Sequence, residues 1–543
     1  MSQSNPDGIP KRPNVILILV DDMGFADLGM MGSEIQTPNL NQLANNGALM
    51  SSMYNCARCC PTRASLLTGL YPHNAGIGHM GANLGTPAYQ GFLRNDSVTI
   101  AEVLQQSDYR TAMSGKWHVA GDFEARDVDN WRTGDLDHPT PRQRGFDQFY
   151  GIIDGASHFF SPHCVFRNED RIEITENNYY FTDAIADKAI EMISDPADAD
   201  SPFFLYLAHT APHWPLHAMP DDIARYDGIY RSGWDSIRTA RHESMNGLGV
   251  LAENWTISPR DETVMPWQAV KHKDWEAAKM ATYAAMIDSL DQSVGRLVDA
   301  LKEQNQFDNT LILFLSDNGG CAEFMAEDGW AQYYPDQTLD GRPISMGNIP
   351  NLNPGDDQTF QSYDKPWANV SNAPFRLYKH YVHEGGISTP LIAHWPNGIK
   401  PGQVIHDPWH VVDIMPTILE TTQSPYLAEY GGHAIQAMEG TSFLQRLCGN
   451  PSHRENPIFF EHEGHSAIRF NHLKLVRQHN QDWELYDMNK DRTELHDLSG
   501  QHKATENELK AMYQDWAEKT GVMDWEDALP RLLQAWNLSS VDG

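Results

Sequence analysis

Runs of branched apolar residues alternate with amphipathic stretches along most of the chain. Residues 14–20 and 310–315 have almost no polar position, which is typical of strands buried on both faces of a mostly parallel sheet. An apolar face recurs every three to four residues in segment 277–303, which predicts a long amphipathic helix. Similar patterns predict further strands at 49–54, 110–115, 203–209 and 389–395, and helices at 38–46, 99–108 and 410–421.

The pattern changes near the C-terminal end. Four short apolar segments separated by turn residues predict an antiparallel sheet, at 458–461, 467–470, 473–477 and 483–487. A helix is expected at 506–519, followed by a tail at 525–538 that could reach another subunit of a homo-oligomer. We therefore predict an α/β fold in two parts. A large, mostly parallel or mixed sheet sandwiched by helices spans residues 10–425, and a smaller α+β domain with an antiparallel sheet spans 426–543.

The net charge of the chain argues against some classes of binding partner. The chain of 543 residues has a formal net charge of −33, which argues against binding nucleic acid or an anionic membrane surface. The same field would repel a small anionic substrate, so an anion site must be a locally basic pocket. The candidate cations for such a pocket are Arg63, Lys116 and Lys379.

The sequence also bears on the compartment. The first 13 residues are polar, and the apolar run 15–20 is too short for a secretory signal. No window is apolar for long enough to cross a membrane. Three of the six cysteines lie within five residues, unlike a secreted disulfide framework. We therefore expect a cytoplasmic protein.

Acidic residues follow both strongly apolar runs. Asp21 and Asp22 come directly after the first, and Asp317 and Asn318 follow the second. If the two strands are parallel neighbours, their carboxyl ends bring four oxygen donors together. Hard oxygen donors select Ca²⁺ or Mg²⁺ over Zn²⁺.

The segment from Cys59 to Gly69 predicts a short helix with a reactive N-terminus. Pro61 suits the first turn, and Gly69 suits the residue after the helix. A helix N-terminus lowers the pKa of a thiol and binds anions through its free N–H groups. Arg63, one turn after Cys59, could bind the same oxyanion.

The Cys-x-Pro-Thr-Arg motif, with the Leu-Thr-Gly that follows it, resembles the signature of the type I sulfatases, arylsulfatase-like enzymes of the alkaline phosphatase superfamily. In that family the cysteine, here Cys59, is oxidised to Cα-formylglycine. Three further segments match, and they contain Lys116 and His118, His213, and Lys379 ahead of a Glu-Gly-Gly. The resemblance covers residues 14–487. It departs at Ser388, where the family often has Arg.

The resemblance implies an alkaline-phosphatase-like fold and hydrolysis of arylsulfate-type monoesters by a formylglycine hydrate. A maturation enzyme would generate the formylglycine. Asp317 would help deprotonate the attacking hydroxyl, His213 would protonate the leaving group, and His118 would take the proton of the second hydroxyl. Three cations would bind the sulfate oxygens, namely Arg63, Lys116 and Lys379. One Ca²⁺, or Mg²⁺ in a tight cavity, would be held by Asp21, Asp22, Asp317, Asn318 and the modified Cys59.

Three alternatives remain open from the sequence. A phosphodiester or phosphonate monoester is a tetrahedral monoanion like a sulfate ester, so a hydrolase of those substrates would need a similar site. Cys56 and Cys59 form a Cys-x-x-Cys, so a thiol redox or binding protein with unmodified Cys59 is another hypothesis. His209 and His217 lie close to His213 in sequence and compete with it for the proposed role.

Overall fold

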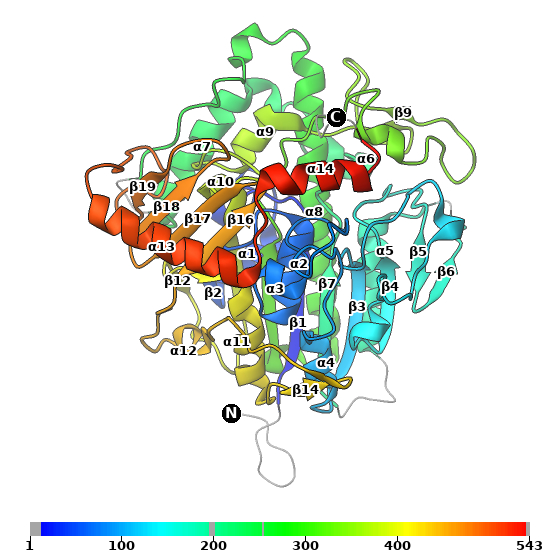
Figure 1. The fold of residues 1–543 in the computed structure, drawn as a ribbon. Coiled ribbons are helices and arrows are strands. Elements are labelled where there is room, and N and C mark those ends of the chain that lie inside the picture. Colours follow the sequence, from blue (N-terminus) through cyan, green and yellow to red (C-terminus); the bar gives the residue numbers. More distant parts are fainter. Residues whose placement is uncertain (1–11, 177, 195–200, 252–254, 539–543) are drawn as a thin grey trace.

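The two apolar runs form the centre of one large sheet (Figure 1). In the computed structural model, which describes residues 12–176, 178–194, 201–251 and 255–538, β1 (Asn14–Val20) and β8 (Thr310–Ser316) are parallel neighbours. The strand order is β12-β2-β11-β8-β1-β7-β3-β4-β5-β6, and β13 also pairs with β2. The strands beyond β1 and β8 are β2 (Ala48–Tyr54), β3 (Arg110–Lys116), β4 (Gln148–Ile152), β5 (Val165–Arg167), β6 (Asp170–Ile172), β7 (Phe203–Ala208), β11 (Ser388–His394), β12 (Gln403–Ile405) and β13 (Trp409–His410).

Alternation along β1 explains why both faces of the sheet are covered. Ile16, Ile18 and Val20 belong to one hydrophobic cluster, and their neighbours at 15, 17 and 19 belong to another. Successive side chains of a strand point to opposite faces. The first cluster includes residues of α1 (Pro38–Asn45), α5 (Phe181–Ile193) and α8 (Lys273–Glu303); the second includes residues of α2 (Cys59–Thr68), α4 (Ile100–Gln105) and α11 (Ile414–Thr422).

The directions of the strands bring several strand ends to one edge of the sheet. β1 is parallel to β7 and β8, and β7 is parallel to β3. β11 is antiparallel to both β8 and β2, so β2 runs in the same direction as β1. The carboxyl ends of five strands and the amino end of β11 therefore lie at the same edge. The predicted mixed sheet between helices is confirmed.

The short C-terminal segments form the predicted antiparallel sheet. Its strands are β16 (Ile458–His462), β17 (His465–Phe470), β18 (Leu473–Arg477) and β19 (Glu484–Asp487), paired in that order. α13 (Lys503–Thr520) lies along this sheet (Figure 1) and packs Leu509, Tyr513 and Trp516 against it. The domain boundary at 425/426 stays a prediction. Residues 10, 11, 177, 195–200, 252–254 and 539–543 of the two predicted domains lie outside the described residues.

Three expectations need adjustment. The helix expected at 410–421 begins later, because His410 pairs with Tyr54 in the large sheet and α11 starts at Ile414. The long helix α8 starts at Lys273, four residues earlier than its apolar face suggests. The C-terminal tail contains α14 (Trp525–Ala535), which packs on its own chain against Leu84 and Tyr89, so contact with another subunit stays a prediction.

Shorter elements connect these layers. The remaining α-helices are α3 (Pro72–Ala75), α6 (Pro220–Ala224), α7 (Trp234–Leu248), α9 (Asp364–Ser371), α10 (Glu384–Ile387) and α12 (Leu444–Leu447), and the remaining strands are β9 (Ser345–Met346), β10 (Thr359–Phe360), β14 (Glu429–Tyr430) and β15 (His433–Ala434). Within the described ranges, no helix combines the length and apolar composition that spanning a bilayer requires.

Candidate active site

The predicted site residues converge at the shared edge of the sheet, although the chain delivers them from six places. Asp21 and Asp22 follow β1, and Asp317 and Asn318 follow β8. Lys116 ends β3, and His213 follows β7. Cys59 and Arg63 lie on α2 after β2, and Lys379 lies ahead of β11. Parallel neighbours end together, so residues far apart in sequence come into contact.

The four predicted metal ligands form one buried group. Asn318 Nδ2 donates to Asp22 Oδ1 at 2.7 Å, and the Asp22 backbone N–H donates to Asp317 Oδ1 at 3.3 Å. All four side chains are at most 2% exposed. Oδ1 of Asp21 and Oδ1 of Asn318 are buried without a hydrogen-bond partner. Buried oxygens of this kind normally have a partner, so the donor set fits a hard cation.

Two of the buried carboxylates, Asp21 and Asp317, have shifted pKa values. Burial alone would raise the pKa of Asp21, but the charges of Lys116 and His213 hold it at about 2. Burial and the neighbouring Asp21 carboxylate raise the pKa of Asp317 well above its ordinary value. Closely packed carboxylates cannot all ionise without positive charge beside them.

Three buried cations surround the carboxylates. Arg63 Nη2 lies 2.7 Å from Asp317 Oδ2, Lys116 Nζ lies 2.6 Å from Asp21 Oδ2, and Lys379 Nζ lies 2.9 Å from Asp22 Oδ1. Their side chains are at most 1% exposed. The three cations predicted for an anion pocket therefore lie together inside an acidic protein, each beside a carboxylate. Each cation has one close carboxylate partner, and its ammonium or guanidinium group carries further N–H donors.

Cys59 begins α2, as the sequence predicts, with Gly69 in the left-handed conformation after the helix. The Cys60 hydrogen bond outweighs burial and, with the charge of Lys116, lowers the pKa of Cys59 well below its ordinary value. The ligand atoms of Cys59, Cys60 and His118 lie within 4.8 Å of one another.

His118 reaches Cys59 by a different geometry from the one expected. An extended segment would place Lys116 and His118 on one side, but His118 adopts the left-handed conformation with φ 56°. β3 ends at Lys116, so the chain is free to turn there. Burial and the charge of Lys116 lower the pKa of His118 to about 4, so its ring is neutral near pH 7.

The structure separates His213 from its two sequence neighbours. His213 Nε2 lies 3.5 Å from Asp22 Oδ2, and its Nδ1 is 2.7 Å from the Trp214 carbonyl oxygen. His209 contacts Ser293, and His217 contacts the carbonyl of Thr359 at 2.7 Å. Those two rings are part of the packed interior, and His213 is the one that faces the carboxylates.

Sequence reasoning missed Glu323. Its Oε2 accepts from Trp214 Nε1 at 2.7 Å, and its Oε1 lies 3.4 Å from Arg58 and 3.9 Å from Lys379. Glu323 therefore connects Lys379 with Arg58, which precedes Cys59, and with Trp214, which follows His213. Its only sequence signal is a carboxylate soon after the Gly319-Gly320 that ends the β8 site segment.

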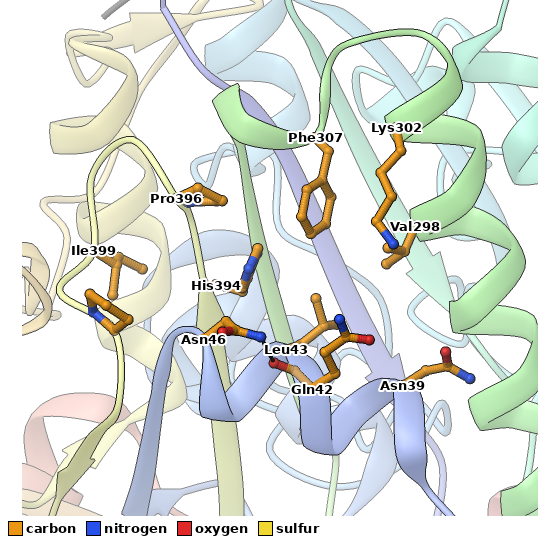
Figure 2. A pocket seen from close by; sticks show the side chains of 11 residues that line it. Asn39, Gln42, Leu43, Asn46, Val298, Lys302, Phe307, His394, Pro396 and Ile399 are labelled. Carbon is orange, nitrogen blue, oxygen red and sulfur yellow. Dashed lines mark hydrogen bonds between the residues drawn. The ribbon is translucent and has the colours of Figure 1, made fainter. Parts of the chain in front are cut away.

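A cavity of about 360 Å³ lies away from this edge, between α1, α8 and β11 (Figure 2). Phe307, which lines it, precedes the amino end of β8, whereas the site follows the carboxyl end. None of the predicted site residues lines this cavity. We therefore place the chemistry at the carboxyl edge.

Two sequence families match parts of the chain. The sequence family described as Sulfatase matches residues 13–424, and the one described as N-sulphoglucosamine sulphohydrolase, C-terminal, matches residues 375–519. An uncharacterized sulfatase of Schizosaccharomyces pombe is 32% identical over 562 residues, covering 96% of each chain. An arylsulfatase of Klebsiella aerogenes is 32% identical, covering 76% of this chain and 86% of its own.

A solved structure shares the architecture. The crystal structure of Ps i-CgsB in complex with k-i-k-neocarrahexaose has a TM-score of 0.66, at 27% sequence identity and with 93% of each chain covered. The family match spans most of the chain, and the first of these relatives matches almost end to end. The chain therefore belongs to the sulfatase family, within the alkaline phosphatase superfamily, and is a hydrolase of sulfuric esters.

Proposed function

We propose that the chain hydrolyses arylsulfate-type monoesters to a phenol or alcohol and inorganic sulfate, using a formylglycine derived from Cys59. One observation carries the proposal. Cys59 starts α2 where three buried cations and four oxygen ligands converge. The likeness to the Klebsiella aerogenes arylsulfatase supports the aryl substrate type.

The nucleophile is assigned to position 59. A maturation enzyme would oxidise Cys59 to the aldehyde, whose hydrate supplies a nucleophilic oxygen in place of sulfur. Asp317 lies on the same edge, held by Arg63 at 2.7 Å, and would accept the proton of the attacking hydroxyl. Splitting the reaction at residue 59 replaces one difficult displacement by two easier ones.

One divalent cation fits the oxygen cluster. Asp21, Asp22, Asp317 and Asn318, with an oxygen on residue 59, would hold it, and the two unpartnered oxygens Asp21 Oδ1 and Asn318 Oδ1 support this assignment. A bound cation supplies Lewis-acid stabilisation of charge on the sulfate. We propose Ca²⁺, because all protein donors are hard oxygens, with Mg²⁺ as the alternative in a tight cavity.

The three cations would bind the other sulfate oxygens. Lys116 and Lys379 each have three N–H donors, and the guanidinium of Arg63 has five. Each already points at the site because a carboxylate holds it. Fixed donors stabilise developing negative charge without reorganising during the reaction.

Two histidines would move protons. Nδ1 of His213 contacts the Trp214 carbonyl, so Nε2 is the atom available to protonate the leaving oxygen. His118, neutral and beside Cys59, can accept a proton from residue 59 when sulfate departs. The two rings contact different residues of the site. His213 lies against Asp22, and His118 lies against Cys59.

Turnover of matched esters tests the sulfate assignment. With matured, metal-loaded protein, we expect kcat/KM for an aryl sulfate to exceed that for a phenyl phosphonate monoester and for an aryl phosphodiester with the same leaving group. The opposite order would assign the chain to the phosphonate monoester and phosphodiester hydrolases, whose substrates carry the same single negative charge.

The expected location also remains a proposal. All six cysteines, which all lie in the described residues, are free thiols, as in a reducing compartment. This supports a cytoplasmic protein. Fractionation of the native host, with activity measured in each fraction, tests it.

A further inference from the structure

A second cluster of metal-ligating side chains lies outside the oxygen site. His79 comes from the loop after α3, His462 ends β16, and Glu463 lies in the turn to β17. Their ligand atoms all lie within 4.8 Å of one another. None of these residues belongs to the site assigned above, and they join segments almost 400 positions apart in the sequence.

The rings in this cluster lack the partners that buried imidazoles need. His462 is completely buried, and neither of its ring nitrogens makes a hydrogen bond to the part of the chain that the structure describes. His79 is 4% exposed, and its Nδ1 is also without a partner. A neutral imidazole has one N–H and one lone pair, and buried polar atoms of this kind are normally satisfied. The ring of His462, with both nitrogens unsatisfied and His79 beside it, indicates a missing ligand.

Two of the three donor separations are close to those of tetrahedral coordination. Glu463 Oε1 lies 3.1 Å from His79 Nε2 and 3.4 Å from His462 Nε2. Zinc–ligand bonds of about 2.0–2.1 Å in a tetrahedron separate neighbouring ligand atoms by roughly 3.4 Å. The His462 contact has this length without hydrogen-bond geometry. Two imidazoles and one carboxylate are a known donor set for Zn²⁺.

We propose that His79, His462 and Glu463 bind a transition-metal cation of the Zn²⁺ class, separate from the oxygen site. Nitrogen donors select such a cation over Ca²⁺ and Mg²⁺. Three protein ligands leave a fourth position for water or another ligand. The two sites of the chain thus differ in donor chemistry and take different metals.

The surroundings complete the site. His380 Nδ1 lies 3.1 Å from both carboxylate oxygens of Glu463, and such a contact fixes the orientation of a ligating carboxylate. A cation is close by, since Arg58 contacts His380, but Arg58 also lies 3.4 Å from Glu323. That carboxylate offsets the charge of the arginine.

The metal would hold the antiparallel sheet against the active-site segments. His462 and Glu463 belong to the β16–β17 hairpin, and His380 directly follows Lys379. Arg58 directly precedes Cys59. Occupancy of the site would therefore fix the hairpin beside both segments without adding a ligand to the sulfate site.

Cobalt(II) binding tests the proposal. Tag-free, full-length protein is stripped with chelator, saturated with Ca²⁺, and titrated with Co²⁺ and then Zn²⁺. We expect one Co²⁺ per chain with the visible absorption of a tetrahedral site, displaced by one Zn²⁺. His462→Gln and His79→Gln should each weaken binding by more than the roughly 10- to 100-fold that loss of an outer-shell partner costs.

Two variants keep the result interpretable. His472→Gln removes an exposed histidine from the turn between β17 and β18 and should leave Co²⁺ affinity unchanged. Glu463→Gln keeps the size of a turn residue whose side chain is 23% exposed, so it should fold and still lose affinity. Absence of tetrahedral Co²⁺ in the unmutated chain, or equal affinity in the Glu463→Gln and His472→Gln variants, would overturn the proposal. Sulfate hydrolysis is measured separately, because the two sites share no ligand.

Discussion

At the scale of single residues, each cation of the proposed sulfate site is positioned by a carboxylate. Lys116 lies against Asp21, Lys379 against Asp22, and Arg63 against Asp317. A buried charge without an opposite charge beside it costs free energy, so the cations and the carboxylates have to be buried together. The same pairing fixes the position of each cation beside the proposed site.

His213 offers the sharpest test of a single residue. If it protonates the leaving oxygen, His213→Ala should slow esters of poor leaving groups most, by about 10²- to 10⁴-fold, because good leaving groups depart without a proton. The measurement is kcat/KM for a series of aryl sulfates that differ in phenol pKa.

His118→Ala is the matched comparison for that series. His118 is assigned a step that follows departure of the alcohol, so its loss should not depend on the phenol. A His213→Ala variant that loses the same factor for every ester would contradict the assigned role.

At the scale of elements, the ends of the strands determine where the side chains of the candidate site lie. Gly115 precedes Lys116 in β3, with φ +118°. An added Cβ would lie 1.8 Å from the carbonyl oxygen of Ala208 on the neighbouring strand β7. Only glycine allows β3 and β7 to stay this close while Lys116 reaches Asp21.

Gly115→Ala should therefore displace Lys116 and lower kcat/KM for an aryl sulfate. A shift near 1 Å costs about 10²-fold in such sites. Gly247→Ala on α7 is the control, since no atom of the described residues lies within 4 Å of its added Cβ. Activity of Gly115→Ala equal to that of this control would show that the close contact has no role in positioning Lys116.

The sequence predicted the elements that are determined by residues close together in the chain. The apolar runs of β1 and β8 and the Asp21-Asp22 and Asp317-Asn318 pairs after them specify a buried sheet with an oxygen cluster at one edge. The helix starting at Cys59 followed from Pro61 and Gly69. Lys379 and the histidine roles came from the family resemblance.

Features set by long-range packing were not predictable from the pattern. The choice among His209, His213 and His217 depends on which ring faces Asp22. The left-handed turn at His118 and the late start of α11 depend on neighbouring strands. Glu323 has no motif of its own, and its role appears only when Arg58, Trp214 and Lys379 gather around it.

At the scale of the whole molecule, a buried ionic network connects the two sheets. Lys474 of β18 lies 2.9 Å from Glu384 and 2.8 Å from Glu494, and all three side chains are fully buried. Arg492 also donates to Glu384 and reaches the backbone of Ser51 in β2. Removing one member leaves an uncompensated charge away from water.

Lys474→Met should therefore lower the free energy of unfolding by about 3–5 kcal/mol. Lys519→Met, which breaks an exposed pair with Asp515 on α13, should change it by less than about 0.5 kcal/mol. Urea unfolding of both variants measures the difference. Equal midpoints for the two would mean that this network does not hold the sheets together.

The central claim is that residue 59 is no longer a cysteine in the working enzyme. Mass spectrometry of the tryptic peptide 59–63, from protein purified from its native host, tests this directly. We predict that Cys59 has lost its sulfur and carries an aldehyde while Cys60 keeps its thiol. Two intact thiols in protein that still hydrolyses sulfate esters would contradict the formylglycine mechanism and leave the thiol itself as the reactive group.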